Sequence, residues 1–402
     1  MKTETEILQC RVIDQGLAGA GEEELLRDLC ERLLETGVPV HRAVLGFDTL
    51  HPVVEGRVTT WSRSTGETRR SDYMRAETNE DDWLQSPFHA LEQSGDRFLR
   101  RRLDHDHRQG EFPILDRLRG EGLTDYLAAR IAFADAEPLG QADCIYGSFA
   151  TDRPGGFADA HLALIEGALP ALALALKAAS AAWIARTLVE TYLGRDAGRR
   201  VLRGEILRGA TQTIRAIIWL SDLRGFTRIA DTTPREQLVP LLNEYAECLA
   251  TAVHDHGGQV LKFMGDGLLA IFDLDDVGTA CGMTLDAALA ARASIASLND
   301  QRAAKGLPVT EFGLALHVGE LLYGNIGSWD RLDFTVIGPA VNEASRIEAM
   351  CGSLDQTVIV SSAFADTAPE CRSRLVSLGR YALRGVARPQ ELFTLDPDAL
   401  PG

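Results

Sequence analysis

The sequence has no pattern of paired cysteines. Its seven cysteines lie far apart, and none belongs to a Cys-x-x-Cys pair (10, 30, 144, 248, 281, 351 and 371). An odd number without close pairs argues against a disulfide framework and against a cysteine-type zinc site. We therefore expect reduced thiols and a cytoplasmic protein.

The chain also lacks an excess of positive charge. Its 402 residues carry a formal net charge of -17. This balance argues against a broad basic surface of the kind that grips nucleic acid or anionic lipid, so we expect no nucleic-acid partner. A small anionic ligand would need local help from metal ions or from a few cationic side chains.

No long apolar run is uninterrupted. The first 16 residues contain no apolar stretch behind a basic cluster, so we expect no secretory signal. The most apolar segment, 161–185, contains Glu166, Pro170 and Lys177. These leave no charge-free run near the roughly 18 to 20 residues that a spanning helix requires. We interpret the segment as a buried or dimerising helix and expect no membrane span.

The length predicts two domains, because 402 residues exceed what one hydrophobic core usually holds. In the first part, 1–184, a helical pattern precedes strand-like segments, a polar insert and further strands, and an apolar helix closes the series. This order is typical of an α+β sensory sandwich, and the layout resembles a GAF-like domain. Such a domain would receive an unknown small-molecule or protein signal.

A helical linker is expected at 185–210, where an apolar seam gives way to a glycine-punctuated stretch. A connector in this place can carry a change from one domain to the other. It can equally be inert spacing, and the pattern alone does not choose between the two.

The second part, 211–398, alternates strands and helices. Strands are expected at 213–222, 311–320 and 333–338, a hairpin at 259–273, and helices after Thr233, near 278–304 and from Pro339. Thr233 with Glu236 predicts a capping box for the first of these helices. The order βαββαβ is that of the ferredoxin-like fold, so the whole chain is expected to be α+β.

Two acidic residues lie where a strand and a neighbouring hairpin are expected to end. Asp222 closes the first strand, and Asp266 lies at the tip of the hairpin. Together their carboxylates can hold hard divalent cations, although either aspartate alone would be read as a turn residue. The following turn, with Gly225, Phe226 and Thr227, supplies backbone N–H groups suited to phosphate oxygens.

The helix from Pro339 has two distinct faces. Ala340, Ala344 and Ile347 form its apolar face, while Asn342 and Arg346, four residues apart, share another face. Exposed Asn and Arg side chains are usually solvated, yet a fixed guanidinium is also what a developing phosphoryl charge requires.

Four ordered motifs now carry a specific resemblance: "SDLRGFT", "KFMGDGLLA", "LHVGELLYGNIG" and "FTVIGPAVNEASR". Their order and spacing resemble the catalytic domain of class III nucleotidyl cyclases from about 213 to 395. The first part of the chain is similar to the sensory region in front of some bacterial members. Pro339 departs from the acid that commonly follows the glycine, but proline suits a first helical turn, so we expect no loss of activity.

The resemblance implies a site for ATP and for two Mg²⁺ or Mn²⁺ ions. Asp222 and Asp266, with the carbonyl group of Leu223, would be the metal ligands. Asn342 resembles the residue that orients the ribose, and Arg346 the residue that stabilises the charged transition state. Cyclic 3′,5′-AMP and pyrophosphate would be the products, and Arg384 resembles a late basic residue near the triphosphate.

Base choice rests on Lys262 and Thr335, which match the Lys/Thr pair of one bacterial adenylyl cyclase subgroup. A lysine donor toward N1 and a hydroxyl group toward the exocyclic amine suit adenine. Guanylyl members typically have Glu and Cys there, and a guanylate cyclase remains an alternative.

The family forms its active site between two catalytic domains, which implies a homodimer here. A diguanylate cyclase is disfavoured because the G-G-D/E-E-F signature is missing. A catalytically silent nucleotide-binding module is the remaining alternative, and it would ordinarily lack one of the catalytic residues.

Overall fold

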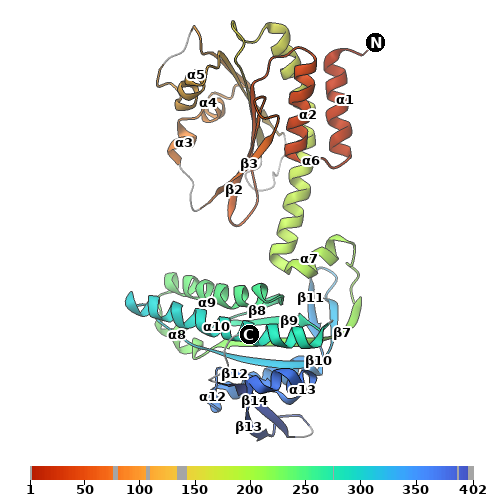
Figure 1. Ribbon diagram of the computed structural model, residues 1–402, viewed down its shortest axis with the longest axis vertical. Coiled ribbons are helices and arrows are strands. Elements are labelled where there is room, and N and C mark those ends of the chain that lie inside the picture. Colours follow the sequence, from red (N-terminus) through yellow and green to blue (C-terminus); the bar gives the residue numbers. More distant parts are fainter. Residues whose placement is uncertain are drawn as a thin grey trace. The chain divides into compact units, whose positions relative to one another are not determined.

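A computed structural model describes residues 2–75, 80–105, 109–133, 143–274, 276–386 and 389–396. The chain divides into two compact units, Met1–Leu188 and Val189–Gly402 (Figure 1). Residues 397–398, the last two of the predicted catalytic domain, lie outside the described residues.

The first unit is built on one antiparallel sheet with the strand order β3-β2-β1-β6-β5-β4. Its strands are β1 (Arg42–Asp48), β2 (Val54–Ser62), β3 (Thr68–Met74), β4 (Phe98–Arg102), β5 (Asp125–Ala132) and β6 (Cys144–Thr151). The long helices α1 (Glu4–Leu17), α2 (Glu22–Glu35) and α6 (Asp159–Leu193) pack on one face. The other face carries the short helices α3 (Glu80–Leu84), α4 (Pro87–Ser94) and α5 (Pro113–Gly120). The predicted α+β organisation of this unit is confirmed, while its GAF-like character stays a prediction.

Strand β5 explains how one sheet serves two cores. Leu127 and Ala129 belong to the core with the long helices, whereas Tyr126 and Ala128 belong to the core with α4 and α5. Successive side chains of a strand point to opposite faces, so a strand buried on both sides is apolar throughout.

Helix α6 continues to Leu193, so the apolar segment at 161–185 and the seam expected at the start of the helical linker form one helix. By length and composition it is apolar enough to cross a membrane, and 44% of its most apolar window is buried within the protein. Its buried residues, among them Ile165, Leu169 and Leu172, pack into the core of the first unit. The absence of a membrane span stays a prediction.

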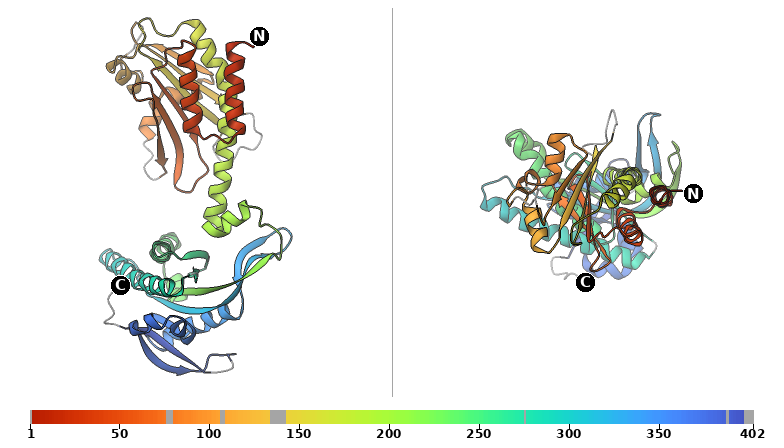
Figure 2. Two further views of the ribbon diagram at one scale, coloured as in Figure 1. Left: turned by 45° about the vertical axis from the view of Figure 1, so that its right-hand side comes forward. Right: turned by 90° about the horizontal axis from the view of Figure 1, so that it is seen from above.

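The second unit has an eight-stranded sheet with the order β13-β14-β12-β10-β7-β9-β8, and β11 pairs with β10 outside this path. Its strands are β7 (Thr211–Leu223), β8 (Gln259–Met264), β9 (Gly267–Asp273), β10 (Phe312–Gly327), β11 (Leu332–Ile337), β12 (Val358–Ser361), β13 (Leu375–Tyr381) and β14 (Gln390–Leu395). The order β10-β7-β9-β8 within it confirms the expected ferredoxin-like arrangement. Strands β7 and β10 pair over thirteen positions and curve together, as Figure 2 shows.

Helices cover both faces of this sheet. They are α7 (Arg195–Leu202), α8 (Phe226–Thr232), α9 (Arg235–Asp255), α10 (Val277–Ala304), α11 (Pro339–Glu348), α12 (Met350–Ser353) and α13 (Ser362–Thr367), with a 3-10 turn at Pro369–Arg374. Helices α9 and α10 lie together on one side (Figure 1), where they pack on Ile217 and Trp219 of β7. Helices α7 and α11 pack on the other side, against Ile218 and Leu220.

The predicted capping box of α9 is wrong. The helix begins at Arg235 with Pro234 as its N-cap, and no side chain caps it. Thr233 instead ends the preceding helix α8, where its N–H group donates to the carbonyl group of Ile229. The sequence pattern did not reveal the short helix α8. Thr233, which resembled the N-cap of α9, is the C-cap of α8.

Candidate active site

Asp222 is placed by the alternation of strand β7. The even positions Ile218 and Leu220 face helix α11, and Asp222 continues this face at the end of the strand. Leu223 points the other way, into the core beneath α9. The carboxylate therefore lies at the end of the central strand β7, at the edge of the sheet formed by its strand ends, on the side of α11.

Asp266 is brought to the same edge by a two-residue hairpin turn. Strands β8 and β9 close between Met264 and Gly267, and Gly265 has a φ of 69°, which the first position of a type II′ turn requires. The hairpin comes close to the end of β7, since a Cβ atom on Gly267 would lie 3.2 Å from Oδ1 of Asp222. The turn therefore presents Asp266 next to Asp222.

The electrostatics of this pair fit a cation. Burial raises the pKa of Asp222, and the neighbouring Asp266 carboxylate raises it further. Two carboxylates that oppose each other's ionisation form a donor set that Mg²⁺ or Mn²⁺ would neutralise. The residues present thus fit the divalent cations that the sequence predicts.

Glu348, at the end of α11, is a third acidic group at this edge. Burial raises its pKa, Arg224 lowers it, and Asp266 raises it. Its Oε1 atom would lie 2.7 Å from a Cβ atom on Gly313, the residue paired with Asp222 across β7 and β10. Within the described ranges, however, no group of three or more acidic, histidine or cysteine side chains could hold a metal ion. A cation bound here would rest on two carboxylates, with substrate phosphates completing its coordination.

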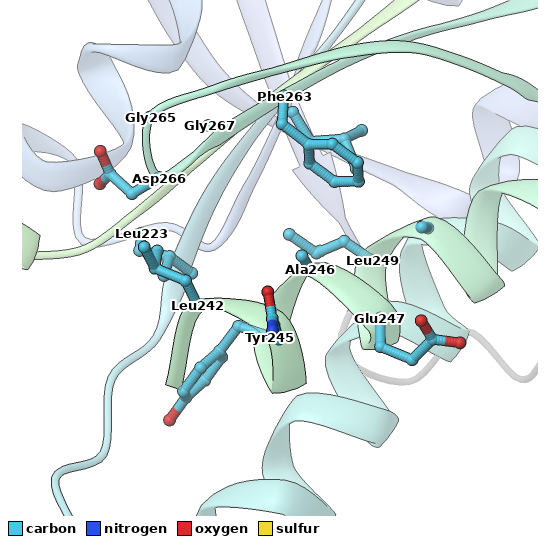
Figure 3. A pocket seen from close by; sticks show the side chains of 13 residues that line it. Leu223, Leu242, Tyr245, Ala246, Glu247, Leu249, Phe263, Gly265, Asp266 and Gly267 are labelled. Carbon is cyan, nitrogen blue, oxygen red and sulfur yellow. The ribbon is translucent and has the colours of Figure 1, made fainter. Parts of the chain in front are cut away.

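A pocket of about 580 Å³ lies between the hairpin and helix α9. Figure 3 shows Asp266 at the hairpin turn, Phe263 across the pocket, and Leu242 and Ala246 of α9 along its lower wall. Most of the labelled side chains are apolar. The pocket therefore supplies a largely apolar wall beside the carboxylates rather than further metal ligands.

The turn after Asp222 has the backbone geometry expected of it. Gly225 has a φ of 63°, and an added Cβ atom would meet nothing within 4 Å, so conformation rather than space favours glycine. The N–H groups of Arg228 and Ile229 donate to the carbonyl group of Gly225. The N–H groups of Phe226 and Thr227 belong to the first turn of α8, where N–H groups have no partner within the helix.

Lys262 and Thr335 lie on strands β8 and β11, whose residues come into contact. The Nζ atom of Lys262 donates to Oδ2 of Asp333 at 3.0 Å. Thr335 is only 6% exposed, and its hydroxyl oxygen is buried without a hydrogen-bond partner. A buried polar atom without a partner is uncommon in a native fold, and a water molecule or a ligand could supply the missing hydrogen bond.

Asn342 and Arg346 project from α11 as predicted, because Ala340, Ala344 and Ile347 are buried and Asn342 is exposed. The exposed Arg384 lies in the loop between β13 and β14. Its neighbour Gly385 brings that loop to Arg346, whose Nη2 atom would lie 3.3 Å from an added Cβ atom. No hydrogen bond or ion pair among the described residues joins this cationic group to Asp222 or Asp266.

Sequence reasoning missed two residues of the site, Glu348 and Asp333. Glu348 follows Arg346 by two positions and turns toward the carboxylates. Asp333 precedes Thr335 by two positions, so the period of a strand places both side chains on one face. The spacing of two positions between Asp333 and Thr335 was the signal in the sequence that could have identified Asp333.

Comparison with protein families gives a match at residues 210–396, to the family described as the adenylate and guanylate cyclase catalytic domain. An adenylate cyclase of Anabaena cylindrica is 34% identical over 157 residues, which are 38% of this chain and 30% of that protein. An uncharacterised protein of Mycobacterium tuberculosis is 31% identical over 208 residues, 52% of this chain and 37% of that protein. The chain thus matches about a third of the length of these curated relatives.

Solved structures similar to the second unit include two cyclases. The adenylyl cyclase CyaB from P. aeruginosa is 24% identical with a TM-score of 0.43, covering 48% of this chain and 98% of that one. The guanylyl cyclase Cya2 is 27% identical with a TM-score of 0.41, covering 47% and 96%. Residues 210–396 are thus similar to the adenylate and guanylate cyclase catalytic domain.

Proposed function

We propose that the protein converts ATP into 3′,5′-cyclic AMP and pyrophosphate at a site shared by two copies of the chain. The observation that carries this proposal is the convergence of Asp222 and Asp266, where burial raises the pKa of Asp222 and the neighbouring Asp266 carboxylate raises it further. Such a pair is suited to a divalent cation with a nucleotide triphosphate. The match to the cyclase family supports the reaction class.

Asp222, Asp266 and the carbonyl group of Leu223 would hold two Mg²⁺ or Mn²⁺ ions. Bound there, the ions would lower the pKa of the ribose 3′-hydroxyl group and neutralise phosphate charge. The N–H groups of Phe226 and Thr227, freed by the turn at Gly225, would bind phosphate oxygens. The 3′-oxygen then attacks the α-phosphorus in line, the hydroxyl proton passes to solvent, and pyrophosphate leaves.

Adenine is the favoured base because of the unpartnered Thr335 hydroxyl group and the Lys262 ammonium group. The hydroxyl group accepts from the exocyclic amine of adenine, and the ammonium group donates to N1. Guanine presents a carbonyl group and an N–H group at these positions. The Thr335 hydroxyl group could donate to that carbonyl group, but the N1–H group would face the Lys262 ammonium group, which has no acceptor. Two donors that face each other disfavour guanine.

Asn342 would orient the ribose, and Arg346 would stabilise charge on the transferring phosphoryl group, with Arg384 beside the triphosphate. Among the described residues of one chain, none of these three makes a hydrogen bond or ion pair with the aspartate pair, and a homodimer would bring the two groups together. Each site would then take its aspartates from one copy and its base-selecting and cationic residues from the other. The first unit would receive an unidentified small-molecule or protein signal in the cytoplasm.

The test is an assay of the purified chain with Mn²⁺ and either ATP or GTP, with the products separated by chromatography. Cyclic AMP should dominate, and Asp222→Asn should abolish it. Preferential formation of cyclic GMP would overturn the adenine assignment. Absence of either cyclic product would instead favour a silent nucleotide-binding module.

A further inference from the structure

Asp333 is a charged residue of the site for which the proposed reaction has no role. It lies on β11, paired with Ile326 of β10, while Thr335 is paired with Gly324. Phe334 and Val336 point into the core beneath α11. Asp333 and Thr335 therefore share the opposite face of the strand, the face from which Lys262 approaches.

The Lys262–Asp333 ion pair is unsuited to a purely structural role. The Lys262 side chain is 34% exposed and that of Asp333 is 57% exposed. Ion pairs this open to water contribute little to the stability of a fold. What the pair does fix is the position of the lysine, because a flexible four-carbon chain otherwise samples many rotamers.

We propose that Asp333 is a specificity-determining residue that positions the Lys262 ammonium group beside the Thr335 hydroxyl group for recognition of adenine. This inference rests on the proposed function. One N–H group of Lys262 is taken by Asp333, and two others stay available as donors. Positioning before binding removes the entropy cost of ordering this side chain and strengthens the contact with the base.

The matching chemistry is that of an acceptor on the purine edge. A held ammonium group offers only donors, which suits N1 of adenine and opposes the N1–H group of guanine. Without Asp333 the ammonium group can swing away, so the penalty for guanine decreases together with the affinity for adenine.

The substitution Asp333→Asn in the full chain tests the proposal. We expect KM for ATP to rise about tenfold with kcat within about twofold, because a positioning contact made equally in ground and transition states changes KM alone. The preference for ATP over GTP in kcat/KM should fall by a similar factor. Asp333→Glu, which keeps a carboxylate, should have a KM for ATP and a preference for ATP over GTP close to those of the wild type.

Asp330→Asn is the matched control, because it removes the same charge from the exposed turn before β11, where Asp330 accepts from Ser328 rather than from a lysine. It should leave KM and base preference as in the wild type. In a Lys262→Met background, Asp333→Asn should have no further effect, since both changes remove one interaction. Additive effects, or a wild-type KM and base preference in Asp333→Asn, would overturn the proposal.

A binding measurement separates this inference from the reaction itself. Equilibrium dialysis with Mn²⁺ and 3′-deoxy-ATP or 3′-deoxy-GTP needs no turnover, because these analogues lack the attacking hydroxyl group. A wild-type preference for the adenine analogue that is lost in Asp333→Asn would support the role of Asp333 even if no cyclic AMP formed. Equal binding of both analogues by the wild type, or binding of neither, would overturn the inference.

Discussion

At the scale of single residues, the site has polar groups that the fold itself does not satisfy. The Thr335 hydroxyl oxygen has no partner, and the Asp222 carboxyl group has a raised pKa next to Asp266. Such arrangements cost stability and are retained where a ligand completes them.

Thr335→Val should therefore separate stability from function. The unpartnered hydroxyl group is lost without loss of a hydrogen bond, so the free energy of unfolding should stay equal or rise by up to about 1 kcal/mol. KM for ATP should rise several-fold. Urea unfolding and initial-rate kinetics give the two values.

Thr284→Val on α10 is the control for this prediction. Thr284 is also buried, but its hydroxyl group donates to the carbonyl group of Ala280 at 2.7 Å. Its loss should destabilise the protein by about 1 kcal/mol and leave KM unchanged. Destabilisation of Thr335→Val to the same extent would mean that its hydroxyl group has a partner within the fold.

His317 makes the stability of the catalytic unit dependent on pH. Its side chain is 4% exposed, its Nδ1 atom lies 2.9 Å from the Ser361 hydroxyl oxygen, and burial lowers its pKa from 6.5 while Glu343 raises it. Below pH 6.5 the unfolded chain binds a proton that the folded state resists, so the free energy of unfolding should fall on acidification. His317 should contribute at most about 1.4 kcal/mol per pH unit to the slope of the free energy of unfolding against pH.

Chemical unfolding of the wild type and of His317→Asn at several pH values from 5 to 8 measures this dependence. The asparagine side chain keeps a polar atom near Ser361 but does not titrate. A shallower slope in His317→Asn is expected, and an identical slope would assign the acid sensitivity to other groups.

At the scale of elements, the linker helix α7 is tied to the strand that pairs with β11. The Tyr323 hydroxyl group of β10 donates to Oδ2 of Asp196 at 3.0 Å, and the same oxygen accepts from Arg200 at 2.7 Å. The Tyr323 ring also meets Phe334, the neighbour of Thr335, at 4.9 Å between centroids. Helix α7 is therefore part of the structure around β10 and β11, so the linker is not a free spacer along its whole length.

Tyr323→Phe should lower the free energy of unfolding by about 1 to 2 kcal/mol, because a partly buried hydrogen bond to a carboxylate is lost. Tyr192→Phe removes a hydroxyl group from an α6 side chain that is 79% exposed and should have no effect. Guanidinium unfolding followed by circular dichroism compares the two. Equal stability of both variants would show that the Tyr323 bond contributes nothing.

The elements differ in how far the sequence could predict them. The hairpin around Asp266 and helix α11 were predictable, because turn residues and apolar periodicity are local signals. Helix α8 was missed because seven residues give almost no periodicity, whereas the helical seam expected after residue 185 is present as the C-terminal end of α6. Likewise, Asp222 and Asp266 could be proposed as neighbours from topology, whereas the contact of Lys262 with Asp333 depends on side-chain positions that no local pattern encodes.

At the scale of the whole molecule, a shared active site predicts complementation between defective chains. Asp222→Ala and Arg346→Ala should each be inactive alone. When they are mixed after unfolding and refolding together, half of the dimers contain both chains, and each mixed dimer has one intact site of two. About a quarter of the wild-type activity should return.

Asp222→Ala mixed with Asp266→Ala is the control, because both changes affect the same half of the site. This mixture should stay inactive. Recovery there, or no recovery in the first mixture, would contradict a site divided between two copies in this way.

The scattered cysteines provide each unit with its own reporter of opening. Cys30, Cys144, Cys281, Cys351 and Cys371 are buried, whereas Cys10 in the first unit and Cys248 in the second are partly exposed. An alkylating reagent should modify these two quickly and the five others only as fast as the surrounding structure opens. Mass spectrometry of the peptides against time then measures opening of the two units separately, and a nucleotide that binds the catalytic unit should slow alkylation of Cys281, Cys351 and Cys371 more than that of Cys30 and Cys144.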